Sequence, residues 1–86
     1  MEYWAKTNAP SASGDYILCS TPGFTWEVIY VGDADDIKKK LLDHLNGDIP
    51  CITQTSPTAF MFELADAARR TERRDELIGE YSPTCN

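Results

Sequence analysis

The segment YVGDADDIKKKLLDHL, residues 30–45, decides the fold, because it joins an apolar strand end to a helix through a glycine. Gly32 permits a sharp exit from the strand, and Asp33 or Asp35 is placed to cap the following helix. Apolar side chains then recur at helical spacing, at Ile37, Leu41, Leu42 and Leu45. Asn46-Gly47 is a typical helix stop, so the segment predicts a strand, a turn and an amphipathic helix.

A β-hairpin is expected before this helix. Residues 15–20 (DYILCS) and 26–31 (WEVIYV) are rich in β-branched and aromatic side chains. The connection between them contains Pro22-Gly23, which is typical of a turn. The two segments therefore predict antiparallel neighbours.

The second half of the chain predicts a loop over 47–57, then a third strand and a second helix. Residues 59–64 (AFMFEL) predict the strand, with Phe60, Phe62 and Leu64 on one face. The helix is expected from about Asp66 to Glu80, ended by Ser82-Pro83. The order β-β-α-β-α predicts an α/β fold, a small three-stranded antiparallel sheet flanked by helices in two or three layers.

Length and composition predict one small domain. The chain has 86 residues, of which 42% are hydrophobic, enough for one modest core. We interpret residues 1–13 as a lead-in, either loose or pinned by Tyr3 and Trp4, and residues 14–86 as the domain. No apolar run reaches the roughly 20 residues that a membrane span needs, and no secretion leader is recognisable, so a cytoplasmic location without membrane contact is expected.

Cysteines and charges restrict the function further. Three cysteines at long separations, Cys19, Cys51 and Cys85, favour buried reduced thiols over a disulfide framework or a zinc site. The net charge of -6 argues against strong non-specific attraction to nucleic acid. Seven of the eight Lys and Arg residues nevertheless lie in two runs, at 38–40 and 69–74, which can form local basic patches.

Three motifs together resemble the GIY-YIG nuclease family over roughly residues 14–86. They are Gly14-Asp15-Tyr16, Tyr30-Val31-Gly32 and the closing stretch LIGEYSPTCN, residues 77–86. The resemblance implies a compact α/β sandwich that hydrolyses phosphodiesters with a divalent metal held by a glutamate. It also implies that Tyr16, Tyr30 and Lys40 belong to the catalytic set if the chain is active. His44, one helical turn after Lys40 on the same face, could join them as a general base or a phosphate contact.

Two positions depart from the family pattern. Lys40 stands where the family has an arginine, and lysine lacks the planar fork that matches a phosphate. Arg74 stands where the family has its metal-binding glutamate, and a guanidinium cannot ligate a hard cation. No metal site is therefore expected, unless Glu63 or Asp33 approaches from elsewhere in the fold.

These departures give a first hypothesis, a degenerate nuclease site that binds nucleic acid or phosphate without efficient hydrolysis. Lys40, Arg70 and Arg74 would bind the phosphate, while Gly32 and Asn86 order the site. Arg74 lies on a helical stripe of mostly small or apolar residues, so it should face the body of the protein and need a partner. The competing interpretation is an internal salt bridge from Arg74 to Asp33 or Glu63.

Two other functions stay open. One is a weak metal-dependent DNA endonuclease, which would need Mg²⁺ or Mn²⁺, whereas the first hypothesis needs no cofactor. The other is a protein-interaction scaffold, favoured by the negative net charge. A larger protein partner is compatible with all three functions, and the sequence leaves the oligomeric state open.

His44 also has an alternative interpretation. A lone histidine in an amphipathic helix is more often a surface or boundary residue than a catalytic one.

Overall fold

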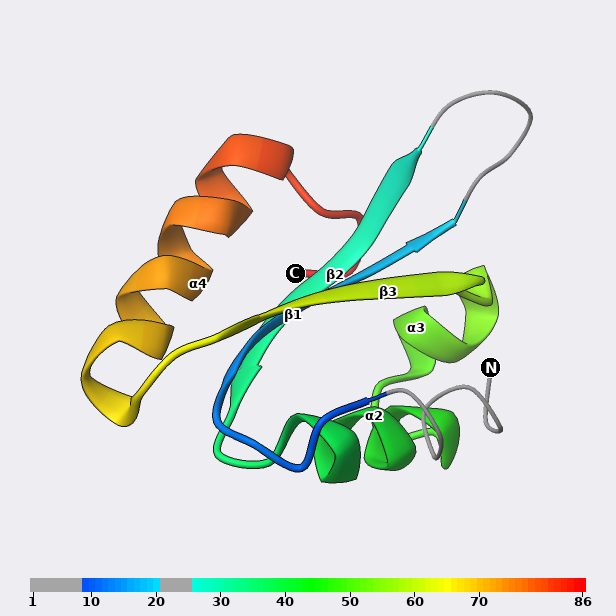
Figure 1. The fold of residues 1–86 in the computed structure, drawn as a ribbon. Helices are drawn as coiled ribbons and strands as arrows, with labels where there is room; N and C mark the ends of the chain where they lie inside the picture. The colour runs from blue at the N-terminus through cyan, green and yellow to red at the C-terminus, as the bar shows by residue number, and fades with distance from the viewer. Residues whose placement is uncertain (1–8, 21–25) are drawn as a thin grey trace.

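The computed structural model describes residues 9–20 and 26–86 (Figure 1). Its strands are β1 (Gly14–Ser20), β2 (Glu27–Ala34) and β3 (Ala59–Leu64), and its helices are α2 (Ile37–Leu45), α3 (Pro50–Thr55) and α4 (Ala67–Tyr81). The predicted order β-β-α-β-α is confirmed, with the short helix α3 added before β3. The expectations for Tyr3, Trp4 and residues 21–25 lie outside the described residues.

β1 is the central strand of a three-stranded sheet in the order β2-β1-β3, and both strand pairs are antiparallel. The predicted hairpin of β1 and β2 is confirmed, with an irregular register between Leu18 and Cys19. Asp15 of β1 lies opposite Asp33 of β2 and opposite Glu63 of β3. Because directly paired residues share a face of a sheet, three carboxylates form a row across all three strands.

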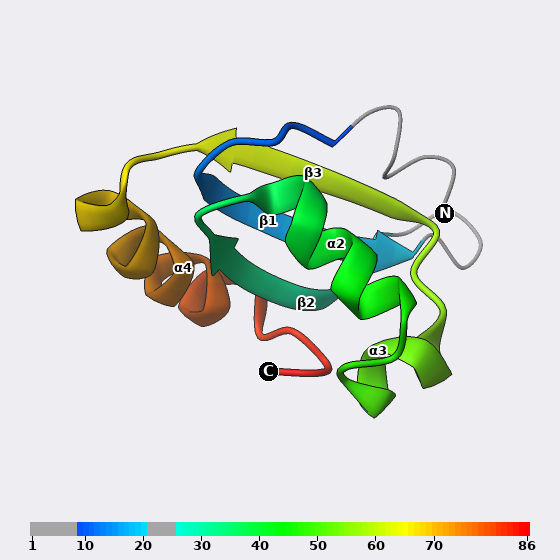
Figure 2. The ribbon, with the colours of Figure 1, turned by 90° about the horizontal axis from the view of Figure 1, so that it is seen from below.

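The helices cover both faces of the sheet, which makes three layers (Figures 1 and 2). Side chains alternate along a strand, so β1 sends Tyr16 and Leu18 towards α2 and α3 and sends Ile17 towards α4. The larger core cluster, on the side of α2 and α3, contains Tyr16, Leu18, Ile37, Leu41 and Ile52. The smaller one, on the side of α4, contains Ile17, Val31 and Leu77. The core is therefore split by the sheet.

Side-chain caps define where the two longer helices begin. Asp36, rather than the predicted Asp33 or Asp35, accepts a hydrogen bond from the Lys39 amide at 3.1 Å and starts α2. Asp66 accepts one from the Arg69 amide at 3.0 Å and starts α4. The two helices end at left-handed residues, Gly47 and Ser82, close to the predicted stops.

One prediction about the second half of the chain is wrong. Residues 50–55, expected within a loop, form α3, with Pro50 in the first turn and Ile52 in the core. Phe60, Phe62 and Leu64 share one face of β3 as predicted, and the rings of Phe60 and Phe62 stack with centroids 6.3 Å apart. Their burial differs, because Phe62 and Leu64 are 46% and 60% exposed whereas Phe60 is buried. Among the described elements, no helix lies close along β3, which explains this exposure, although Phe60 reaches the core cluster of α2 and α3.

The cysteine prediction is wrong for two of the three thiols. Cys51 of α3 and Cys85 of the C-terminal tail form a disulfide, while Cys19 is free and buried as expected. Disulfides persist mainly in oxidising compartments, so the cytoplasmic location stays a prediction. No helix among the described residues is long and apolar enough to cross a membrane.

The tail that follows α4 runs along the outer edge of β2. The amides of Thr84 and Cys85 donate to the carbonyls of Val28 and Ile29 at 3.2 and 2.7 Å. The Asn86 side chain accepts from the Val31 amide at 2.7 Å and donates to the Val31 carbonyl at 2.8 Å. Backbone groups on this edge of the sheet are thereby satisfied within the chain.

Candidate functional site

The motif glycines are required by packing. A Cβ atom at Gly32 would collide with the Tyr16 ring, and one at Gly14 would collide with the Glu63 carbonyl of β3. Each glycine thus allows a close approach that any larger residue would prevent. Gly32 does not end the strand as expected, because β2 continues to Ala34; instead, Gly32 leaves the space that the Tyr16 phenol fills.

Tyr16, Tyr30 and His44, three of the predicted catalytic residues, lie together. The Tyr16 hydroxyl is 2.6 Å from His44 Nε2, and the ring centroids of Tyr30 and His44 are 5.2 Å apart. His44 Nδ1 lies 2.8 Å from Asp48 Oδ1. Because a carboxylate only accepts, Nδ1 carries a proton, and in the neutral imidazole Nε2 accepts from the Tyr16 hydroxyl.

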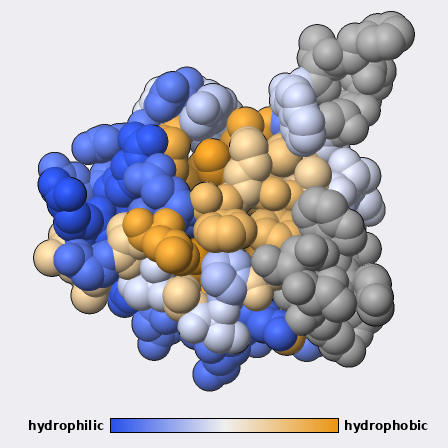
Figure 3. Space-filling view, viewed as in Figure 1, coloured by the Kyte–Doolittle hydropathy of each residue, from blue (hydrophilic) through white to orange (hydrophobic). Residues whose placement is uncertain are grey.

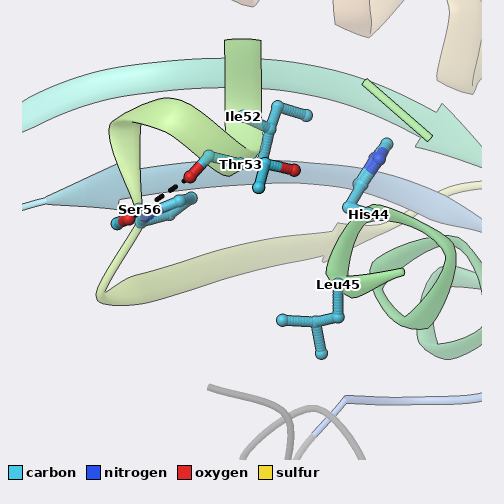
Figure 4. Close-up of a pocket in the computed structure, with 6 residues that line it drawn as sticks. His44, Leu45, Ile52, Thr53 and Ser56 are labelled. Carbon is cyan, nitrogen blue, oxygen red and sulfur yellow. Dashed lines mark hydrogen bonds between the residues drawn. The ribbon is translucent and has the colours of Figure 1, made fainter. Parts of the chain in front are cut away.

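His44 is a core residue rather than a surface or boundary residue. It is 2% exposed, although it also borders a cavity of about 230 Å³ between α2 and α3. Figure 4 shows the imidazole beside Ile52 and Thr53, with Ser56 at the far end of α3. The buried imidazole is satisfied on both nitrogens, one by Tyr16 and the other by Asp48.

Burial is the main cause that raises the pKa of both tyrosines. For Tyr16, which is 1% exposed, repulsion by Tyr30 and Asp48 adds to the effect of burial on its pKa. For Tyr30, Asp48 raises the pKa further, while Arg74 lowers it. Both phenols are therefore neutral at physiological pH, and the Tyr16 phenol is engaged inside the core.

Arg74, at the expected metal position, forms an internal ion pair. Its Nη1 donates to Asp33 Oδ1 at 2.9 Å, and its Nη2 donates to Asp75 Oδ1 at 3.2 Å. The alternative of a salt bridge to Asp33 is what the structure shows, whereas Glu63 pairs with Arg73 at 3.4 Å. The hydrogen bond with Asp75 is the main cause that raises the pKa of Arg74, so this cation is permanent.

Arg70 approaches the same carboxylate. Its Nε lies 3.5 Å from Asp33 Oδ2, and its Nη1 donates to Ser13 Oγ at 3.0 Å. Asp33 therefore sits between two guanidinium groups of α4. A carboxylate from β2 thus neutralises part of the positive charge where the resemblance implies a metal-binding glutamate.

Lys40, one helical turn before His44, borders a different cavity from the one at His44. It borders a groove of about 380 Å³, shared by the start of α2 and by Arg70. Within residues 9–20 and 26–86 it forms no ion pair, so its ammonium is available to a ligand. The groove also carries carboxylates, at Asp33, Asp35, Asp36 and Asp43.

The residues present do not fit a divalent metal. Across the described parts of the chain, no group of three His, Cys, Asp or Glu side chains is arranged to hold one. Neither of the predicted substitutes repairs the site, because Asp33 is engaged by arginines and Glu63 lies on β3 beside Arg73. A hard cation would need several oxygen ligands there.

Sequence reasoning missed two carboxylates. Asp48 follows His44 by four residues, a spacing that could have indicated their pairing. Asp15 is the middle residue of the first motif, and a carboxyl inside an apolar strand could have been questioned on composition alone. It is 1% exposed, and burial, followed by repulsion from Asp33 and Glu63, raises its pKa to about 6.

Solved structures share this architecture. The GIY-YIG N-terminal endonuclease domain of UvrC from Thermotoga maritima, bound to its catalytic magnesium, superposes with a TM-score of 0.81 at 19% identity, over 99% of this chain and 94% of that one. The chain has the GIY-YIG endonuclease fold. An asparagine-to-alanine mutant of that domain superposes with a TM-score of 0.81 at 18% identity, and a tyrosine-to-phenylalanine mutant with a TM-score of 0.80 at 18% identity. Both comparisons cover 99% of this chain and 93% of the other.

At this identity the similarity establishes the fold and not the activity. The sequence matches no protein-family model and no curated protein. The predicted sandwich of helices and a three-stranded sheet is confirmed by the GIY-YIG endonuclease structures. The roles of Tyr16, Lys40, His44 and Arg74 stay predictions, and the geometry described above limits what each can do.

Proposed function

We propose that this chain is a GIY-YIG-fold module that binds the phosphates of a nucleic acid without hydrolysing them. One observation supports the proposal: the guanidinium of Arg74, which stands where the resemblance implies a metal-binding glutamate, is paired with Asp33 at 2.9 Å. A guanidinium held there leaves no oxygen ligand for a metal. The UvrC domain, by contrast, is bound to its catalytic magnesium.

Lys40 is the proposed phosphate contact. Its ammonium borders the groove beside Arg70 and has no carboxylate partner within the described residues. Arg70 and Arg74 share Asp33, so they would orient a phosphate only by exchanging part of that ion pair. Because the chain carries a net charge of -6, we expect weak binding with few phosphate contacts.

The buried tyrosine cluster is proposed to support the groove. The Tyr16 hydroxyl is held by His44 inside the core, and His44 is held by Asp48. A phenol that is 1% exposed is out of reach of a phosphodiester unless the core opens. We therefore assign Tyr16 and His44 to positioning rather than to proton transfer with substrate.

Fluorescence anisotropy on a labelled 20-nucleotide DNA, in EDTA and at two salt concentrations, tests the binding. Lys40→Ala should weaken binding and lower the salt slope by about 1, the value for one lost phosphate contact. Lys38→Ala is the matched control, because residues two apart point to different sides of a helix. Equal affinity of Lys40→Ala and the wild type would contradict the assignment.

Cleavage of the same DNA with Mg²⁺ or Mn²⁺ tests the absence of hydrolysis. We expect no product from the wild type. Lys40→Arg combined with Arg74→Glu restores the family pair, and the gain of metal-dependent nicking would show that this fold lacks only those groups. Metal-dependent cleavage by the wild type would instead favour the endonuclease alternative.

A protein-interaction scaffold is the second candidate. The observation that favours it is the exposed apolar surface of β3, where Met61, Phe62 and Leu64 are 50%, 46% and 60% exposed. Figure 3 shows this hydrophobic surface beside the hydrophilic surface of α4. Isolated apolar side chains are ordinary on a surface, but a contiguous group marks an interaction site.

A further inference from the structure

The face of the sheet that α4 covers contains a cavity of about 220 Å³ between β3 and α4. Its apolar wall is formed by Ile17, Met61, Leu77 and Tyr81. Asp15 and Glu63 add two carboxylates from neighbouring strands. The cavity exists because α4 packs against β1 and β2 and leaves β3 uncovered.

Asp15 is the unusual member of this cavity. It is 1% exposed, yet neither of its carboxylate oxygens accepts a hydrogen bond within the described residues. The other two carboxylates of the row have cationic partners, Asp33 with Arg74 and Glu63 with Arg73. A buried acceptor without a donor costs about 1 to 3 kcal/mol, and a buried charge costs more. Among residues 9–20 and 26–86 the fold therefore leaves one strong acceptor without a donor, and a group from outside the chain could supply it.

Charge around the cavity favours a cation as that donor. Arg73 also borders the cavity, but its guanidinium is held by Glu63 at 3.4 Å and by Glu76 at 3.1 Å. The two carboxylates that line the cavity, Asp15 and Glu63, therefore outnumber this one arginine. The raised pKa of Asp15 has the same origin, burial and then repulsion by neighbouring carboxylates, and a bound cation would relieve both.

We propose that this cavity binds a lysine or arginine side chain presented by a partner protein. The cationic head would reach Asp15, and the aliphatic stem would lie against Ile17 and Leu77. Long basic side chains combine these two chemistries, because they bury their methylene groups and direct the charge to an acceptor. The exposed residues Met61 and Tyr81 stand at the rim, where the neighbouring residues of the partner would pack.

A free polyamine offers the same charge but no backbone to pack on the apolar rim. The partner-protein source is favoured because Met61 and Tyr81 extend exposed apolar surface beyond the cavity, at 50% and 45%. Nucleic acid is disfavoured here because the one arginine that lines the cavity, Arg73, is already paired with Glu63 and Glu76, whereas Lys40 in the groove has no such partner within the described residues. The proposed site is therefore separate from the groove at Lys40.

NMR titration of the whole chain tests the proposal with a capped peptide that has one lysine between two leucines. Saturable shifts at Asp15, Met61 and Leu77 are expected, and the peptide with norleucine in place of lysine should bind at least tenfold more weakly. Spermidine is titrated in parallel. Binding of spermidine with no binding of the peptide would overturn the partner-protein source.

Asp15→Asn removes the charge with little change in shape, so it should weaken peptide binding at least tenfold. Glu80→Gln is the matched control, since it makes the same charge change at an exposed site on α4 outside the cavity. Met61→Lys is a second variant at an exposed position, where the new ammonium can reach the carboxylates and exclude the peptide. Unchanged binding in Asp15→Asn, or no peptide binding to the folded wild type, would overturn the proposal.

DNA binding by these variants separates this proposal from the proposed function. Asp15→Asn should leave the anisotropy of the labelled DNA unchanged, because the Lys40 groove does not include Asp15. Loss of DNA binding in Asp15→Asn together with loss of peptide binding would show one shared site and overturn the separation.

Discussion

The two outer strands of the sheet have different surroundings. β2 is packed by α2, α3 and α4, and the C-terminal tail hydrogen-bonds to its outer edge. No described helix lies close along β3, and three of its apolar side chains, those of Met61, Phe62 and Leu64, are exposed. β2 is therefore held in place by packing and by hydrogen bonds, including those from Asn86 of the tail to Val31. β3 instead offers surface for contacts outside the chain. The predictions below test this contrast.

The largest expected effect is on the β2 side. Cys85→Ser removes the disulfide to Cys51, which closes a loop over a sequence separation of 34 residues. The loss should be about 3 to 4 kcal/mol in the free energy of unfolding, measured with urea. Cys51→Ser should give the same loss of stability, and the double variant should be no less stable than either single variant, because all three variants lack the same disulfide. Unchanged stability would mean that the tail holds β2 without the disulfide.

Asp15→Asn, in the cavity between β3 and α4, is expected to increase the stability of the fold. Asp33, Glu63, Arg73 and Arg74 face Asp15, and the net effect with burial raises its pKa from 3.8 to about 6. A carboxyl with a raised pKa destabilises the fold when ionised, so wild-type stability should fall as pH rises from about 4 to 6. The variant should be more stable above pH 7 by up to about 3 kcal/mol, since each pKa unit corresponds to about 1.4 kcal/mol.

Thermal unfolding of both proteins between pH 3 and 8 measures this gain. The two curves should converge below about pH 4, where Asp15 is protonated in the folded and the unfolded states. Glu80→Gln should follow the wild-type curve. A constant difference at every pH would show that the gain has a cause other than the Asp15 charge.

A smaller loss of stability is expected from Asn86→Ala. Asn86 makes two hydrogen bonds to Val31, so truncation leaves a partly buried amide and carbonyl without these partners. The cost should be about 1 to 3 kcal/mol. Hydrogen exchange should accelerate at the Val31 amide more than at the amides of β1. Uniform acceleration would instead indicate general destabilisation.

The smallest effect on stability is expected from Leu64→Ser. Leu64 is 60% exposed and outside both core clusters, so the free energy of unfolding should change by less than about 0.5 kcal/mol. Association of the protein with apolar surfaces, measured by dye binding, should decrease. A loss above about 2 kcal/mol would mean that β3 is packed more closely than its exposure indicates.

Local signals in the sequence predicted the elements well. The bounds of β3 agree with the expected 59–64, and α4 lies within one residue of the expected helix at each end. Caps, turn residues and apolar periodicity act over a few residues, so they can be recognised along the chain. α3 was missed because six residues without an amphipathic period resemble a loop.

Pairings between distant segments could not be predicted in the same way. Arg74 had Asp33 and Glu63 as possible partners, and only the sheet register shows that α4 brings Arg74 to the first and Arg73 to the second. Cys51 and Cys85 likewise gave no sign of proximity, because their approach depends on how the tail returns to α3. His44 looked like a boundary residue since its partners, Tyr16 and Asp48, come from outside its own helix.

Gly14 and Gly32 have a consequence for how such domains are recognised. Both are needed for steric reasons, one beside the Glu63 carbonyl and the other beneath the Tyr16 ring. A lineage that loses its chemistry must still keep them in order to fold. The motif therefore indicates the fold, and finding it in a sequence does not establish nuclease activity.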